Sequence, residues 1–248
     1  MARILKVDEI APDFKRYLIE APVISTRHKA GQFVIVLLSE LGERIPLTIA
    51  ASDALHGTIT LVVQEVGKTT MEMGCLRPGD TLRVVGPLGK PTHIDKLGTC
   101  VCIGGGCGIA PLLPIARANR DAGNHVVSIL GGRTHEFLIL LHEISAVSEE
   151  VYLSTDDGSL GEKGLVNHAL EKYIEISGNP EQVVAIGPAV MMRAVSEMTR
   201  PLGIPTVVSL NTIMIDGTGM CGGCRVPVGG ESKFVCVDGP EFDAHEVD

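Results

Sequence analysis

In the chain of 248 residues, the pattern of predicted secondary structure changes near Gly98. Before that residue, short β-rich runs (FVIVLLSE, TITLVVQEV and DTLRVVG) are separated by turn sequences such as AGQ, LGER and RPGD. After it, five strand-like runs alternate with helical patterns over residues 109–123, 136–144, 164–174 and 189–203. The first pattern predicts an antiparallel β-barrel, and the second predicts a doubly wound, parallel α/β sheet.

Regular periodicity stops after Leu210, where a cysteine-containing stretch begins. Asp216, Cys221, Cys224 and Cys236 follow a D-x4-C-x2-C-x11-C spacing among many glycines. Four anionic ligands on small, glycine-rich turns are typical of a [2Fe-2S] cluster. A structural zinc site is the alternative, but it usually has a second closely spaced cysteine pair. The sequence thus predicts three parts: residues 1–97, 98–210 and an iron-sulfur module at 211–248.

Composition excludes several classes of function. The formal net charge of −9 disfavours nucleic acid and anionic membranes as partners. No run of about eighteen apolar residues is present, and the start MARILKVDEI lacks a secretory pattern, so we expect a cytoplasmic protein. Reduced thiols are then expected, with Cys75, Cys100 and Cys102 in the core.

A glycine-rich turn follows the first strand of the second part, with the sequence GGGCGIAP. Gly104, Gly106 and Gly108 allow a tight turn and a close approach to a pyrophosphate, and Pro111 suits the first turn of the following helix. Arg133 follows the second strand, where it can pair with a ribose 2′-phosphate or simply be a solvated surface residue. NAD and NADP therefore both remain possible.

Further candidate residues lie at later strand ends, where open α/β sheets bind ligands. Asp156 and Asp157 follow one strand, and Gly187, Pro188 and Met191 follow another. Each set alone is also explained by a turn or a packed helix start. Together they outline a single crevice.

The ordered motifs RIPLTIA, VGKTT, GPLG, GGGCGIAP, TDDGS, IGPAVMM and the cysteine loop resemble the ferredoxin-NADP reductase superfamily over essentially the whole chain. Within it, the chain resembles electron-transfer subunits of dihydroorotate dehydrogenase. It is also similar to the small subunits of NADH-dependent ferredoxin:NADP oxidoreductases and the related sulfide dehydrogenases.

The resemblance implies that FAD binds to the barrel. The family's first flavin-binding stretch falls on Ile45, Pro46, Leu47 and Thr48, with Thr48 near the flavin N5 and Arg44 standing where it can reach the pyrophosphate. Adjacent strand residues point to opposite faces, which leaves the role of Arg44 open. The second flavin-binding stretch falls on Val63, Gln64, Gly67, Thr69 and Thr70.

The resemblance also bears on three further positions, two of which have alternative interpretations. The loop's first cysteine in dihydroorotate subunits corresponds to Asp216, which is either a carboxylate ligand to iron or a cap of the loop. The family's cysteine near the nicotinamide is replaced by Ile186, which removes no essential step because the flavin itself accepts hydride. Cys107 is either a substitute thiol or a small residue packed beneath the pyrophosphate.

These residues predict an NAD(P)H-dependent oxidoreductase subunit that passes electrons through FAD to a [2Fe-2S] cluster and then to a larger catalytic subunit. A ferredoxin:NADP oxidoreductase that serves ferredoxin through the complex, with or without electron bifurcation, is the first hypothesis. The electron-transfer subunit of a dihydroorotate dehydrogenase is the second. A zinc-stabilised nucleotide-binding module without redox activity is an alternative of another class.

Overall fold

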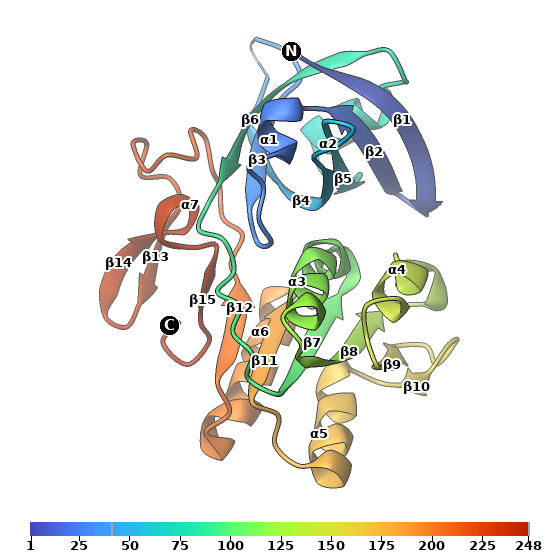
Figure 1. Ribbon diagram of the computed structural model, residues 1–248, viewed down its shortest axis with the longest axis vertical. Helices are drawn as coiled ribbons and strands as arrows, with labels where there is room; N and C mark the ends of the chain where they lie inside the picture. The colour runs from blue at the N-terminus through green and yellow to red at the C-terminus, as the bar shows by residue number, and fades with distance from the viewer. Residues whose placement is uncertain (41, 248) are drawn as a thin grey trace. The chain divides into compact units, whose positions relative to one another are not determined.

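The computed structural model describes residues 1–40 and 42–247, which form two compact units (Figure 1). The barrel unit comprises Met1–Thr92, Asn211–Pro227 and Glu231–Pro240. The sheet unit comprises His93–Leu210, Val228–Gly230 and Glu241–Asp248. The cysteine loop therefore belongs to the barrel unit by its contacts. The division into 1–97, 98–210 and 211–248 stays a prediction.

A closed antiparallel barrel with strand order β1-β2-β5-β4-β3-β6 confirms the first predicted fold. Its elements are β1 (Ala2–Ala11), β2 (Phe14–Glu20), α1 (Pro22–Ser25), β3 (Phe33–Leu37), β4 (Ile45–Asp53), β5 (Thr58–Gln64), α2 (Lys68–Gly74) and β6 (Thr81–Leu88). Apolar residues alternate along the strands, and one set of them fills the barrel, including Ile4, Tyr17, Ile49 and Leu61. The opposite set faces outward.

The sheet unit contains a seven-stranded sheet of order β10-β9-β8-β7-β11-β12-β15, which confirms the predicted α/β fold. Its elements are β7 (Thr99–Gly105), α3 (Ile109–Asp121), β8 (His125–Gly132), α4 (Leu141–Ser145), β9 (Glu150–Thr155), β10 (Glu162–Lys163), α5 (Val166–Ser177), β11 (Gln182–Ile186), α6 (Ala189–Thr199), β12 (Thr206–Ser209) and β15 (Glu241–Asp243). Helices α5 and α6 pack on the face formed by Val101, Val127 and Val183. Helix α3 contacts the same strands and carries other buried side chains. From β7, the strands β8, β9 and β10 are added on one side and β11 and β12 on the other, so the strand order reverses between β7 and β11. Doubly wound sheets bind ligands at such a switch point.

Two local predictions in this unit were wrong. Residues 136–144 do not form one helix: a 3-10 turn spans His135–Phe137, and α4 begins only at Leu141, after Leu140 in a left-handed conformation (φ 54°). Leu138, Ile139 and Leu140 are all buried. A continuous apolar segment shows no helical periodicity, so the sequence pattern could not distinguish it from a helix. The last strand, β15, pairs antiparallel with β12, in a region where no regular element was expected.

The cysteines outside the loop divide into two groups. Cys100 and Cys102 are fully buried on β7, as predicted. Cys75 is exposed at the end of α2, so its prediction as a core residue was wrong. Its position is the C-cap, where the side chain turns toward the Met71 carbonyl (Sγ–O 3.7 Å) and does not reach the barrel interior. Within the described residues, none of the helices combines the length and apolar character that a membrane crossing requires.

Candidate cofactor sites

Two buried thiols converge in the cysteine loop. Cys224 lies just before β13 (Arg225–Val228), and Cys236 lies in the short helix α7 (Val235–Asp238), which follows β14 (Glu231–Phe234). The hairpin of β13 and β14 brings the two sulfur atoms within 3.2 Å of each other, although eleven residues separate them in sequence. Burial, followed by the hydrogen bond from Cys224, raises the pKa of the Cys236 thiol to about 12. A bound metal reverses that balance because it favours the thiolate.

Asp216 organises the backbone of the same loop. One carboxylate oxygen accepts a hydrogen bond from the Thr218 amide (2.7 Å), and the other accepts one from the Cys221 amide (2.6 Å). The Thr218 amide, followed by that of Cys221, holds the pKa of Asp216 below its ordinary value. The residue is therefore an anion that caps the loop. Each carboxylate oxygen has a second lone pair, so these bonds are compatible with coordination of iron as well.

The four predicted cluster ligands are only partly gathered. Within residues 1–40 and 42–247, no three His, Cys, Asp or Glu side chains converge as a ready metal site. Cys224 and Cys236 are together, whereas Cys221 is exposed and Asp216 faces the loop amides. The donor set suits an iron-sulfur cluster, since thiolates and a carboxylate on a glycine-rich loop are present. Completion of the set requires the Cys221 and Asp216 side chains to reorient.

The loop packs directly on the outer face of the barrel. Gly217 has φ +73°, and a Cβ there would lie 2.5 Å from Leu88 Cδ1 and 3.1 Å from Ile35 Cγ1. Ile35 on β3 is paired with Pro46 on β4. The cysteine loop therefore contacts a strand that neighbours the predicted flavin-binding strand. Adjacent strands lie about 4.8 Å apart.

The predicted flavin-binding stretch on β4 presents alternate residues to two sides. Ile45 and Leu47 are half-buried and pack against the barrel core. Pro46 and Thr48 occupy the alternate positions and so face outward with Ile35 and Phe33, their partners on β3. Arg44 is exposed and directly precedes β4. The outer face of β4 therefore offers a hydroxyl, with an arginine at the start of the strand.

The second predicted flavin-binding stretch spans the end of β5 and the start of α2. Val63 is buried in the barrel core, and Gln64 is half-buried. The Thr70 hydroxyl accepts hydrogen bonds from the Val66 and Gly67 amides (3.1 and 2.9 Å), which fixes the turn. Thr69 is buried and donates to Glu43 (Oγ1–Oε2 3.0 Å), a carboxylate that the sequence analysis did not select. Glu43 precedes Arg44, so this contact ties the two flavin-binding stretches together.

The three glycines of the GGGCGIAP turn that were predicted to form the site, Gly104, Gly106 and Gly108, serve different purposes. A Cβ on Gly104 would lie 3.0 Å from Leu112, so this position allows the strand and helix α3 to pack. Gly106 has φ +54° and open space around its Cβ position. A Cβ on Gly108 would lie 2.2 Å from the Ile186 carbonyl oxygen. Only Gly106 combines a tight turn with an open face for a pyrophosphate.

The turn lies next to the residues that follow β11. A Cβ on Gly105 would lie 2.5 Å from Met191 Sδ and 3.2 Å from Pro188 Cδ, and one on Gly187 would lie 2.7 Å from Met191 Cε. The structure therefore brings Gly187, Pro188 and Met191 to the switch point between β7 and β11. Pro111 lies in the first turn of α3, as predicted. Cys107 is exposed in the 3-10 turn at 106–108, so both interpretations of this residue, as a substitute thiol or as a small residue beneath the pyrophosphate, stay predictions.

Arg133 and the acidic pair also lie together. The Asp157 amide donates to the Arg133 carbonyl (3.3 Å), and the Asp156 amide donates to the Gly132 carbonyl (3.1 Å). The side chains of Arg133, Asp156 and Asp157 are all exposed. One arginine and two carboxylates thus share a surface at the ends of β8 and β9.

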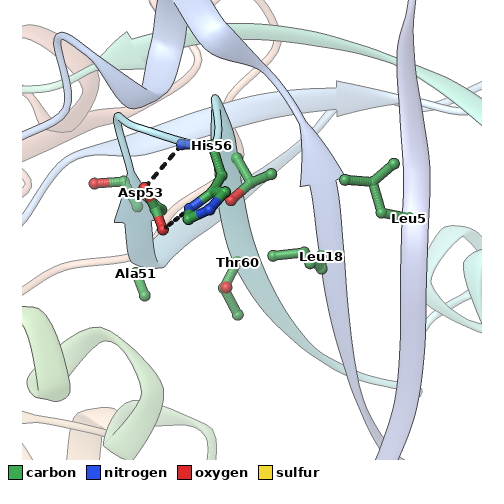
Figure 2. A pocket seen from close by; sticks show the side chains of 8 residues that line it. Leu5, Leu18, Ala51, Asp53, His56 and Thr60 are labelled. Carbon is green, nitrogen blue, oxygen red and sulfur yellow. Dashed lines mark hydrogen bonds and ion pairs between the residues drawn. The ribbon is translucent and has the colours of Figure 1, made fainter.

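A hollow of about 530 Å³ on the barrel contains none of the predicted site residues (Figure 2). It is lined by Leu5, Leu18, Ala51, Ser52, Asp53, His56, Thr58 and Thr60. His56 contacts Asp53 at its rim (Nδ1–Oδ2 2.6 Å). The hollow is lined by the end of β4 (Ala51 to Asp53), whereas Pro46 and Thr48 lie near its start.

Two functional candidates near the cysteine loop escaped the sequence analysis. The guanidinium of Arg225 lies over the Phe234 ring, 5.4 Å from its centroid. No sequence signal pairs these residues, because their contact depends on the β13–β14 hairpin. In the sequence, only its position directly after Cys224 indicates that Arg225 lies near the predicted cluster.

Comparisons with known proteins agree with the three-part organisation. Residues 1–93 match an oxidoreductase FAD-binding domain, and residues 102–197 match an oxidoreductase NAD-binding domain. Residues 211–248 match the iron-sulfur cluster binding domain of dihydroorotate dehydrogenase B. These matches show that the chain is part of an oxidoreductase with FAD-, NAD- and iron-sulfur-binding domains.

Individual relatives are similar along nearly their full length. A homolog of the dihydroorotate dehydrogenase B (NAD(+)) electron transfer subunit from Thermotoga maritima is 48% identical over 99% of this chain and 86% of its own. The corresponding subunit from Geobacillus thermodenitrificans is 33% identical over 91% and 89%. A chain of the solved NADH-dependent reduced ferredoxin-NADP oxidoreductase, a structure described for flavin-based electron bifurcation, is 45% identical, with a TM-score of 0.94 over 100% and 90% of the two chains.

Proposed function

The chain belongs to the family of electron-transfer subunits of dihydroorotate dehydrogenase B, and from this premise we propose that it carries electrons from NADH through FAD and a [2Fe-2S] cluster to a larger catalytic subunit. The observation that carries the proposal is that Gly217 of the cysteine loop packs against Ile35 on β3. Ile35 is paired with Pro46 on β4, the predicted flavin-binding strand. This packing supports a flavin and a cluster within one compact unit. The zinc-stabilised alternative lacks support, because the terminal domain matches an iron-sulfur family.

The residues divide the work of binding and positioning. Thr48 supplies a hydroxyl on the outer face of β4 for the flavin ring, and Arg44, with the Gly67–Thr70 turn, supplies groups for its phosphates. Ile45, Leu47 and Val63 support these groups from the barrel interior. When bound, FAD supplies the conversion of a two-electron hydride into single electrons. Gly106 and the start of α3 hold the dinucleotide pyrophosphate, with Gly187, Pro188 and Met191 alongside.

We propose NADH as the preferred dinucleotide. Asp156 and Asp157 share a surface with Arg133, so the local formal charge is negative. Carboxylates disfavour a 2′-phosphate and accept hydrogen bonds from the hydroxyls of an unphosphorylated ribose. Arg133 is then a surface residue, and NADPH should be a poorer substrate than NADH.

We propose as the partner the larger subunit of a ferredoxin:NADP oxidoreductase that bifurcates electrons and serves ferredoxin, and the similarity to a chain of the solved NADH-dependent reduced ferredoxin-NADP oxidoreductase supports this choice. The aspartate at position 216 favours it over a dihydroorotate partner, since related dihydroorotate subunits carry cysteine there. The names of the curated relatives support the dihydroorotate alternative. Affinity purification from the native cell distinguishes the two. A companion chain that oxidises dihydroorotate would reverse the order of these proposals.

Anaerobic isolation tests the central proposal. We expect a yellow-brown protein with roughly two iron atoms and two acid-labile sulfides for each FAD, as a [2Fe-2S] centre requires. Added NADH should bleach both the flavin and the cluster absorption, and NADPH should do so more slowly. A colourless preparation that contains zinc and no sulfide would contradict the proposal.

The Asp216→Ala substitution tests whether the carboxylate is an iron ligand. Since a carboxylate is a harder donor than a thiolate, its loss should change the EPR signal of the cluster or remove it. Asp216→Asn is the matched control, because its amide oxygen still accepts one loop hydrogen bond but supplies no anionic donor. If both variants keep the EPR spectrum of the unaltered protein, Asp216 only caps the loop.

A further inference from the structure

Arg225 stands beside the predicted cluster ligands without a carboxylate partner. It follows Cys224 directly, and the Cys224 side chain is buried next to Cys236. Among the residues that the structure describes, the only side-chain interaction of Arg225 is with the Phe234 ring (5.4 Å). Arg225 therefore keeps its positive charge uncompensated by any ion pair.

The guanidinium is held over the loop that joins two of the ligands. A Cβ on Gly222 would lie 3.3 Å from Arg225 Nη2, so the charged group lies against the turn between Cys221 and Cys224. Phe234 fixes it there through a cation–π contact from the neighbouring strand. The geometry places a fixed cation beside the loop that is predicted to surround the cluster.

The other charged groups of the hairpin are already engaged. Glu231 pairs with Lys233, and the Asp238 carboxylate accepts the Phe234 amide (2.7 Å). Asp216 accepts the Thr218 and Cys221 amides. Arg225 is thus the one uncompensated cation of this loop and hairpin among the described residues.

We propose that Arg225 raises the midpoint potential of the cluster, a role that rests on the proposed function of the loop. Reduction adds one negative charge to a centre whose ligands are already anionic, and a nearby cation stabilises that added charge. The electron enters from the flavin and leaves to the partner, so the arginine favours transfer onto the cluster. Arg225 acts through its charge and is not itself a ligand.

Redox titration of the purified full chain, followed by EPR, tests this role. The Arg225→Gln variant should reduce the equilibrium constant for one-electron reduction about tenfold, which corresponds to a potential lower by about 59 mV. Arg225→Lys should keep most of the potential because it keeps the charge. Arg193→Gln removes an exposed arginine from α6 and should leave the potential unchanged.

Phe234→Leu provides an independent measurement if Arg225→Gln fails to hold iron. It keeps both the charge and all four ligands but releases the guanidinium from its fixed position. We expect an intermediate potential with a stronger dependence on salt, since a mobile exposed charge is screened. Unchanged potentials in the iron-containing Arg225→Gln or Phe234→Leu proteins would overturn the proposal. Lack of iron and sulfide in the unaltered chain would instead contradict the proposed function.

Discussion

The Cys236→Ser substitution should yield a protein that keeps FAD but contains little or no iron. Cys236 is buried 3.2 Å from the Cys224 sulfur, and a serine hydroxyl does not ionise readily enough to replace a thiolate ligand. Iron and acid-labile sulfide should fall more than tenfold, while the flavin absorption remains. NADH should still reduce the flavin, but electrons should no longer reach a one-electron acceptor through the partner subunit.

Cys75→Ser is the matched control for that experiment. Cys75 lies in the same barrel unit, but it is exposed at the C-cap of α2 and far from the loop in sequence. Its replacement should leave the iron, sulfide and flavin contents unchanged. Equal iron loss in both variants would indicate general damage, and normal iron in Cys236→Ser would remove Cys236 from the ligand set.

The sequence predicted the architecture well because its periodicities report burial. Short β-rich runs separated by turn sequences predicted the barrel, and the alternation of strand-like and helical segments predicted the sheet unit. The failures have local physical causes. The apolar run before α4 is buried throughout, so it has no period, and β15 has only three residues and depends on pairing with β12.

The candidate sites were predictable in part. Spacing identified the cysteine loop, but it could not show that Cys224 and Cys236 meet while Cys221 stays exposed. The role of Arg44 could not be read from strand alternation, because β4 begins only at Ile45; within the strand, Ile45 packs on the barrel core and Thr48 takes the opposite face. Arg225 was not selected because the importance of a charged side chain depends on its neighbours in space.

The Gly108→Ala substitution should destabilise the sheet unit by about 3 kcal/mol or more, which exceeds the usual cost of an added methyl group in a packed region. The added Cβ would lie 2.2 Å from the Ile186 carbonyl oxygen and 2.5 Å from its carbonyl carbon. Both atoms belong to the backbone and cannot turn aside as a side chain can. The start of α3 and the end of β11 must therefore separate. Urea unfolding followed by circular dichroism measures the effect.

Gly106→Ala is the matched comparison in the same turn. It has no atom within 4 Å of its Cβ position, and its φ of +54° alone should cost about 1 kcal/mol of stability. Its face is the one predicted to meet the pyrophosphate, so the methyl group should raise the KM for NADH severalfold in a protein that remains folded. Gly108→Ala should instead lose stability first and NADH binding as a consequence. A Gly108→Ala protein as stable as Gly106→Ala would show that the β11–α6 turn yields easily, and the switch point would then be a flexible site.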